Sequence, residues 1–233
     1  MAIEVKNTKG LANISGVKLL VVGASGSGKT NLARSTGKTI IISAESGDLT
    51  LNDVDVDTVR VKSLNELKEA YKYVKDNSDK YDTVIIDSIT ETGDLIVAEL
   101  KKDPEFSSMK DGMKLWMKFS EIMLAIAKSF RDLDNINVVI LALAESIKNG
   151  FEEKIMPMIP AKKVQAKLGS LYDEVLMIRV DEDGNREFVC RPIPDFDAKD
   201  RSGKLEPVEP YDKLKGLKPI FNKILQIKES KWK

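Results

Sequence analysis

The segment best suited to chemistry is a glycine-rich loop that runs from residue 23 to residue 30. It reads GASGSGKT directly after the apolar run 17–22, which is the G-x-x-x-x-G-K-[ST] spacing in its required place between a strand and a helix. Successive backbone N–H groups in such a loop surround a phosphate, and the following helix points its positive dipole end at the same anion. The residues predicted to bind phosphate are Gly23, Ala24, Ser25, Gly26, Ser27, Gly28, Lys29 and Thr30.

Two side chains of this loop and one strand-end acid have distinct expected roles. Lys29 supplies a point charge near the outer phosphates, and Thr30 offers its hydroxyl to Mg²⁺. The apolar strand 83–87 ends in Asp87, which would bring a carboxylate to the same metal at the carboxyl edge of a parallel sheet. We therefore expect ATP and Mg²⁺ as ligands, with Thr30 and Asp87 as the metal ligands.

Two other predicted strands also end near an acid. Glu45 follows strand 39–44, where a carboxylate could hold and polarise a water for attack on the γ-phosphate. The alternative is an exposed loop acid, because the loop 45–57 is rich in aspartate. Glu145 follows strand 137–143, at a point that can sense the γ-phosphate and signal to the next loop. A carboxylate so close to phosphate needs a bridging partner.

The bulk composition excludes several classes of protein. The chain has 37 basic and 37 acidic side chains, so any nucleic-acid contact must come from a local patch. It has no histidine, which excludes histidine-based catalysis and histidine metal sites. A single cysteine, Cys190, excludes a disulfide framework. No apolar run approaches the length of a membrane span. We expect a cytoplasmic protein with no membrane partner.

Short apolar strands alternate with helical stretches, which predicts an α/β fold with a mostly parallel sheet flanked by helices. We expect one domain over residues 1–233, with an N-terminal arm at 1–16 and a basic helix or tail at 211–233. The periodic stripe on the helix 112–133, which includes Trp116, is interpreted as core packing without a functional role. The expected strands are 17–22, 39–44, 57–61, 83–87 and 137–143, followed by a hairpin of 173–180 and 186–192.

These elements, in this order, resemble the ATPase core of RecA-like recombinases over residues 15–205. The resemblance implies that Glu45, in Ser-Ala-Glu-Ser, is the catalytic acid and that Asp87 is the Walker B acid. It places Glu145 at the switch position, where the family usually has an amide. It also implies that Lys199 and Arg201, in the segment AKDRSG, reach the ATP site of a neighbouring subunit, and hence that the protein forms a ring or a filament.

The chain is similar, more closely still, to a compact group of phage-encoded nucleotide-binding proteins. The matching features are the short stretch before the phosphate loop, the tryptophan-bearing helix ahead of NVVILA at 137–142, and FDAKDR at 196–201. Some members of that group act as single-strand annealing proteins. The resemblance implies single-stranded DNA as partner, a single-strand-binding protein as a further partner, and the host cytoplasm as location.

In RecA-like cores two loops at the carboxyl edge of the sheet line the DNA channel, and their counterparts here are 91–112 and 146–169. In the second, residues 154–172 include four lysines and no acid. Lysines for phosphates and an aromatic ring for stacking suit single-strand binding, although an ordinary surface loop is an alternative. The residues predicted to contact DNA are Phe151, Lys154, Lys162, Lys163 and Lys167.

Two other segments give weaker signals for DNA. In the loop 91–112, Lys101, Lys102, Phe106 and Lys110 are interspersed with acids. The segment 213–233 is rich in lysine, ends near Trp232 and has an apolar helical face. A helix docked on the core is expected there, with a DNA-contacting tail at 229–233 as the alternative.

The leading hypothesis is a single-stranded-DNA-dependent ATPase that acts as an oligomer and promotes annealing or recombination. A nucleoside or nucleotide kinase would also open with a phosphate loop, but such enzymes usually carry an arginine-rich lid, and this chain has no cluster of arginines in its middle. A nucleotide-gated module that recruits a replication partner with little hydrolysis is the third hypothesis.

Overall fold

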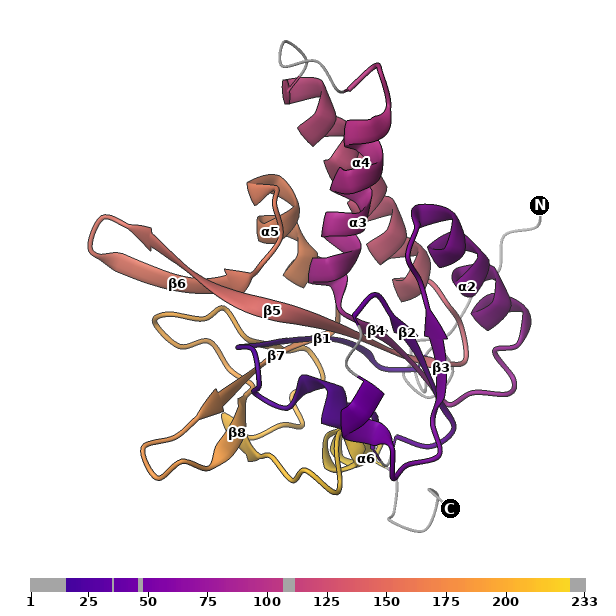
Figure 1. Ribbon diagram of the computed structural model, residues 1–233. Helices are drawn as coiled ribbons and strands as arrows, with labels where there is room; N and C mark the ends of the chain where they lie inside the picture. The colour runs from indigo at the N-terminus through magenta and orange to yellow at the C-terminus, as the bar shows by residue number, and fades with distance from the viewer. Residues whose placement is uncertain (1–15, 35, 46–47, 107–111, 227–233) are drawn as a thin grey trace, which may run out of the picture.

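The computed structural model describes residues 16–34, 36–45, 48–106 and 112–226. Its centre is a parallel sheet that runs through the middle of the molecule (Figure 1). The parallel strands are β1 (Lys18–Gly23), β2 (Thr39–Ser43), β3 (Asp57–Arg60), β4 (Thr83–Asp87), β5 (Asn137–Asn149) and β7 (Glu174–Val180). They lie in the order β7-β1-β5-β4-β2-β3.

Antiparallel strands extend this sheet beyond its parallel centre. They are β6 (Glu152–Pro157), β8 (Arg186–Val189), β9 (Lys199–Asp200) and β10 (Val208–Pro210). The strand β8 follows β7 as a hairpin and pairs in turn with β10, while β6 folds back on β5 and β9 pairs with the start of β7. The expected α/β fold, with a mostly parallel sheet and a C-terminal hairpin, is confirmed.

Helices cover both faces of the sheet (Figure 1). One face carries α2 (Leu64–Asp76), α3 (Ile89–Lys102), α4 (Gly112–Arg131), α5 (Lys162–Leu168) and the short η4 (Gly169–Leu171). The other carries η1 (Lys29–Ala33), η2 (Asp48–Leu51) and α6 (Lys218–Leu225). Within the described ranges, no helix combines the length and the apolar composition that crossing a membrane requires.

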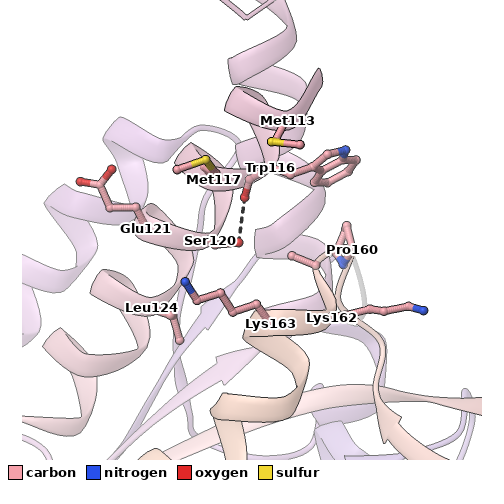
Figure 2. Close-up of a pocket in the computed structure, with 10 residues that line it drawn as sticks. Met113, Trp116, Met117, Ser120, Glu121, Leu124, Pro160, Lys162 and Lys163 are labelled. Carbon is pink, nitrogen blue, oxygen red and sulfur yellow. Dashed lines mark hydrogen bonds between the residues drawn. The ribbon is translucent and has the colours of Figure 1, made fainter. Parts of the chain in front are cut away.

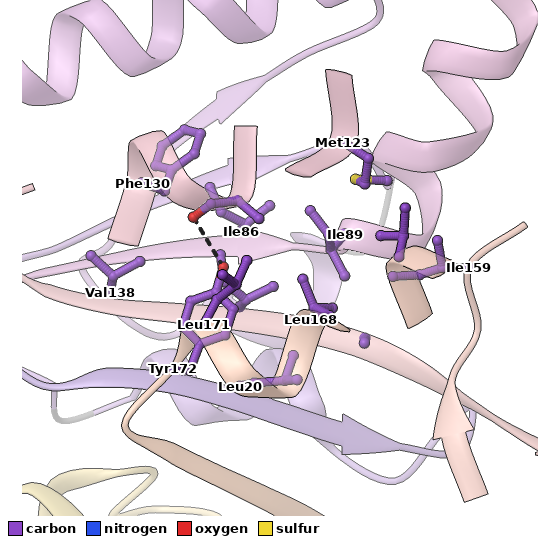
Figure 3. Close-up of a cluster of buried hydrophobic side chains, with 14 of the residues drawn as sticks. Leu20, Ile86, Ile89, Met123, Phe130, Val138, Ile159, Leu168, Leu171 and Tyr172 are labelled. Carbon is purple, nitrogen blue, oxygen red and sulfur yellow. Dashed lines mark hydrogen bonds between the residues drawn. The ribbon is translucent and has the colours of Figure 1, made fainter. Parts of the chain in front are cut away.

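Alternate residues of each central strand enter opposite cores, because side chains in a strand point to opposite faces. Leu20 and Val22 belong to the core that lies under α2, α3, α4 and α5, whereas Leu19 and Val21 belong to the core that includes α6 and η1. Both faces are therefore buried, which explains the continuous apolar runs in the sequence. The larger core is closed near the end of α4 by Tyr172, whose hydroxyl donates to the Ala127 carbonyl at 3.3 Å (Figure 3).

Three sequence expectations are wrong in part. The element after the phosphate loop, where the sequence predicts a helix, is a short 3₁₀ helix that ends at Ala33. The supposed loop 91–112 is mostly α3, because Ser88 accepts from the backbone N–H of Glu91 and caps the helix. The supposed loop 146–169 contains the ends of the β5–β6 hairpin and α5, because cross-strand pairing extends β5 as far as Asn149.

The apolar stripe on α4 is only partly a core stripe. Phe119, Met123 and Phe130 are fully buried, as expected, but Trp116 is 42% exposed. The first turns of α4 project away from the sheet (Figure 1). The apolar repeat thus extends into turns of the helix that have no neighbouring surface to bury their side chains. The interpretation of Trp116 as a core residue is therefore wrong.

Candidate functional site

The predicted nucleotide residues gather at the carboxyl edge of the parallel sheet. The strand register pairs Gly23 of β1 with Leu143 of β5, and Asp87 of β4 with Leu141 of the same strand. Because β5 lies between β1 and β4, the phosphate loop and Asp87 flank it from two sides. Glu145 lies two residues beyond Leu143 on the intervening strand.

The backbone of the loop forms a cradle in which two glycines lie close to neighbouring side chains. Gly28 has φ +97°, and a Cβ there would lie 2.5 Å from the Tyr211 hydroxyl. A Cβ on Gly23 would lie 2.6 Å from the Ser27 Oγ. That Oγ is buried and makes no hydrogen bond to the described part of the chain. A cradle of this shape with an unused buried hydroxyl fits a phosphate ligand.

Lys29 lies over this cradle, although its side chain is almost fully buried. Its Nζ donates to the carbonyls of Gly23 at 3.0 Å and Ala24 at 2.9 Å. Burial lowers the pKa of Lys29 below its ordinary value, and the nearby charges of Asp87 and Glu45 oppose that shift. The two carboxylates thus favour the charged ammonium that a phosphate would need.

Thr30 and Asp87 form the predicted metal pair. Thr30 Oγ1 donates to Asp87 Oδ2 at 2.7 Å, and Asp87 is buried at the end of β4. One hydroxyl and one carboxylate are a sparse set of hard oxygen ligands, which is how Mg²⁺ is commonly bound beside the phosphates of a nucleotide. The residues present therefore fit MgATP.

Glu45 is tied to the same edge and is not a free loop acid. Ser88 Oγ donates to Glu45 Oε1 at 2.7 Å, and Ser43 Oγ donates to the Glu45 carbonyl at 2.6 Å. Ser88 directly follows Asp87, so the two strand-end acids are linked through adjacent residues. The structure thus brings together Lys29, Thr30, Asp87 and Glu45.

Glu91 is a residue of this site that sequence reasoning missed. It lies in the first turn of α3, and burial raises its pKa, with the charges of Glu45 and Asp94 adding to the shift. The available signal was the Ser-x-x-Glu spacing of Ser88 and Glu91, a capping box placed directly after a predicted strand.

Arg186 and Tyr211 also reach the phosphate loop, and sequence reasoning missed both. Arg186 Nη2 on β8 donates to the Gly26 carbonyl at 3.2 Å, and the Tyr211 hydroxyl donates to the Gly28 carbonyl at 2.8 Å. Phe188 supports the Tyr211 ring at a centroid distance of 5.4 Å. No local signal marks these residues, because their contacts span most of the chain.

Glu145 has an amide partner on α5. Gln165 Nε2 on α5 donates to Glu145 Oε1 and also to the Pro157 carbonyl, the latter at 2.8 Å. The contact joins the strand β5, which passes the nucleotide edge, to the helix α5. Glu145 is therefore linked to α5 through an amide.

The structure places Lys199 and Arg201 away from this site of their own chain. The strand β9 pairs with β7 at Glu174, and the register of β1 and β7 puts Glu174 beside Leu19. Leu19 comes four residues before Gly23, about 13 Å along a strand. Lys199 Nζ donates to the Gly169 carbonyl at 2.9 Å, and Arg201 pairs with Asp173 at 2.6 Å.

The predicted DNA residues fall on two different elements. Phe151 is fully exposed at the tip of the β5–β6 hairpin, and Lys154 on the same hairpin pairs with Asp197 at 2.9 Å. Three of the lysines lie on α5 and are exposed: Lys162, Lys163 and Lys167. Lys110, Trp232 and the tail 229–233 lie outside the described residues.

A comparison with protein-family models shows the family to which this chain belongs. The model of the AAA domain family matches residues 15–202. The chain belongs to the AAA domain family. The loop, Asp87 and Glu45 all lie within the matched range, so this AAA domain has the nucleotide-binding ATPase fold that the sequence predicts.

Two solved structures are similar to this AAA domain over most of both chains. A KaiC-like protein from the hyperthermophilic archaeon Pyrococcus horikoshii OT3 is 14% identical, with 86% of this chain and 94% of that chain covered and a TM-score of 0.44. The RadB recombinase is 18% identical, with 85% of this chain and 92% of that chain covered and a TM-score of 0.45. No curated protein matches this AAA domain.

Proposed function

We propose that this AAA domain protein binds and hydrolyses MgATP, that single-stranded DNA stimulates the hydrolysis, and that the activity promotes strand annealing or recombination. The observation that carries the proposal is a continuous set of contacts at the sheet edge. Thr30 contacts Asp87 at 2.7 Å, and Ser88, the next residue, contacts Glu45 at 2.7 Å. A metal-binding pair and a candidate base are thus fixed side by side.

Each residue has a stated role in this proposal. The backbone of residues 23–28 and the Lys29 ammonium bind the phosphates. Thr30 and Asp87 would hold Mg²⁺, which would neutralise part of the phosphate charge. Glu45 accepts a proton from the attacking water, and Ser88 orients its carboxylate. Arg186, beside the loop at Gly26, adds positive charge near the same phosphates.

Oligomerisation would complete the site. Lys199 and Arg201 cannot reach the loop of their own chain, because β9 joins β7 at the opposite end of the parallel strands. A neighbouring subunit could present them instead, and cations that reach the γ-phosphate across an interface stabilise transition-state charge. We therefore propose a homo-oligomer, ring or filament, in which hydrolysis depends on assembly.

A chain of contacts joins the candidate nucleotide site to the candidate DNA surface, and it supports the proposed stimulation of hydrolysis by DNA. The strand β5 passes the nucleotide edge at Leu143 and continues to the hairpin that carries Phe151. Gln165 joins Glu145 on this strand to α5, which carries the exposed lysines. An element contacted from both sites can be biased by either ligand. We propose that this connection links single-stranded DNA to hydrolysis.

ATP turnover titrated with single-stranded DNA at several protein concentrations tests the proposal. The expected result is a rate per chain that rises with DNA and with protein concentration. No binding of MgATP, or turnover indifferent to DNA, would contradict it. Phosphate transfer to a nucleoside would favour a kinase, and tight binding without turnover would favour a nucleotide-gated module that recruits a replication partner such as a single-strand-binding protein.

A further inference from the structure

A groove of about 480 Å³ lies between α4 and α5, apart from the nucleotide edge. Figure 2 shows Met113, Trp116 and Met117 of α4 on one side, and Pro160 with Lys162 and Lys163 at the start of α5 on the other. The groove therefore combines an apolar wall that contains an aromatic ring with a basic wall.

The apolar wall is unusually open to solvent. Trp116 is 42% exposed, Met113 is 79% exposed and Met117 is 67% exposed. The Trp116 ring is held edge-on against the fully buried Phe119, with the ring centroids 5.8 Å apart. One side of the indole is thus fixed by the core while another stays accessible. Large apolar side chains that are exposed together beside a groove are a candidate interaction surface.

The charge of the two helices is positive although the chain as a whole is neutral. The only acid of α4 is Glu121, and α5 has none. Glu121 itself lines the groove and pairs with Lys118 of the same helix at 3.1 Å, so the groove lining has one acid beside two lysines. The side chains of Lys162 and Lys163 make no hydrogen bond or ion pair to the described part of the chain. The basic residues of the two helices are Lys114, Lys118, Lys128, Arg131, Lys162, Lys163 and Lys167.

We infer that this groove binds single-stranded polynucleotide, with a base stacked on Trp116 and flanking phosphates bound by Lys162 and Lys163. The inference rests on the proposed function and names the surface that would contact DNA. The charge of the groove selects this occupant, because an aromatic platform beside unpaired lysines suits a chain of bases and phosphates. The neighbouring methionine side chains are polarisable and adapt to irregular apolar surfaces, which suits bases of any identity.

The position of α5 also connects the groove to the nucleotide edge. Lys162 and Lys163 lie on the same short helix as Gln165, whose amide donates to Glu145. A polynucleotide bound along the groove would therefore contact the helix that Glu145 touches from the other side. This arrangement requires neither Phe151 nor the C-terminal tail for the stacking contact.

The direct test uses Trp116 as its own probe in a Trp232→Phe background, so that the indole of the groove is the only tryptophan. Addition of single-stranded oligothymidylate should quench its fluorescence saturably. In anisotropy measurements with a labelled oligonucleotide, Trp116→Ala should weaken binding about 5- to 150-fold, the range for loss of one stacked base. Trp116→Phe should restore most of the affinity, because it keeps an aromatic face.

The lysines are tested by salt dependence. Lys162→Ala/Lys163→Ala should reduce the slope of log K against log salt by about 1.4, because two phosphate contacts to a single strand are lost. Lys72→Ala/Lys75→Ala removes the same charge from exposed positions of α2 and should leave the slope unchanged. Thermal unfolding checks that each variant is folded. If Trp116→Ala does not fold, the salt slope of the lysine variants still tests the inference.

The outcomes separate this inference from the proposed function. If the wild type binds the oligonucleotide but the Trp116 and lysine variants bind as tightly and with the same slope, the inference is overturned and the proposed function stands. Unchanged Trp116 fluorescence at saturating oligonucleotide also overturns it and points to a protein occupant. If the wild type binds no single strand in the presence of MgATP, both the inference about the groove and the proposed function are contradicted.

Discussion

The Ser88 hydroxyl donates a hydrogen bond of 2.7 Å to the Glu45 carboxylate, and thereby joins the N-terminus of α3 to the loop after β2. The same hydroxyl accepts from the backbone N–H of Glu91 at 3.3 Å. One side chain thus caps a helix and holds the candidate base. Ser88 is a positioning residue, because it acts on the reaction through Glu45.

Ser88→Ala should lower turnover more than it lowers nucleotide affinity. A hydrogen bond to a charged group contributes about 1.5–3 kcal/mol, so kcat should fall roughly 10- to 100-fold if Glu45 loses its orientation. Loss of the cap should cost about 1 kcal/mol in the free energy of unfolding. Ser88→Thr keeps the hydroxyl and should restore kcat. Equal turnover of the alanine and threonine variants would contradict the positioning role.

Gly28→Ala should abolish tight nucleotide binding. The residue has φ +97°, and the added Cβ would lie 2.5 Å from the Tyr211 hydroxyl, so the cradle must deform. The left-handed backbone alone costs a non-glycine residue about 1–2 kcal/mol. Gly112→Ala is the control, because a Cβ there meets no atom within 4 Å. Calorimetric titration with MgATP compares the nucleotide affinities of the two variants. Equal affinities would refute the proposed cradle.

Arg201→Ala should remove the dependence of turnover on assembly. An arginine that acts across an interface is worth about 10³-fold or more in kcat, whereas its exposed ion pair with Asp173 contributes little to stability. Asp173→Ala breaks the same pair and leaves Arg201 in place, so this variant should retain turnover that rises with protein concentration. If both variants behave alike, Arg201 does not act in trans.

The buried carboxyl of Glu174 should make the stability of the fold fall with rising pH. Burial raises its pKa from 4.5 to about 8, and the charges of Asp200 and Asp173 add to the shift. Between these values the folded state retains a proton that the unfolded state releases. The associated stability is therefore complete below pH 4.5 and is lost as the pH rises through about 8.

Glu174→Gln should remove this loss. Denaturant unfolding at several pH values should give a flatter profile for the variant than for the wild type, with the variant more stable near pH 8. Glu182→Gln, at an exposed turn position, is the control and should keep the wild-type slope. A parallel decline in wild type and Glu174→Gln would show that another group causes the pH dependence.

Local patterns were sufficient to find the centre of the site. The residue spacing directly after an apolar strand is enough to identify the phosphate loop. The acids that end the strands of a parallel sheet lie at one edge of the sheet, whatever the details of packing. The sequence alone therefore predicts that Asp87 and Glu45 lie near one another. The Ser-x-x-Glu spacing of Ser88 and Glu91 also indicates the start of α3, which conflicts with the prediction of a loop over 91–112.

The remaining features depend on tertiary structure. Arg186 and Tyr211 reach the loop from the C-terminal part of the chain, and no short-range pattern encodes such a contact. Trp116 continues a helical stripe whose other members are buried, but periodicity does not reveal where the helix outruns the sheet. The strand β5 was predicted too short, because its last residues owe their extended form to pairing with β6.

The most direct test of the central claim is ATP hydrolysis by Glu45→Gln. The variant keeps the shape of the side chain but cannot accept the proton, so nucleotide binding should persist while kcat falls about 10²- to 10⁴-fold. Calorimetric titration with MgATP and a phosphate-release assay, both run with single-stranded DNA, measure the two quantities. Retained binding with lost turnover would support the account, and turnover equal to that of the wild type would contradict it.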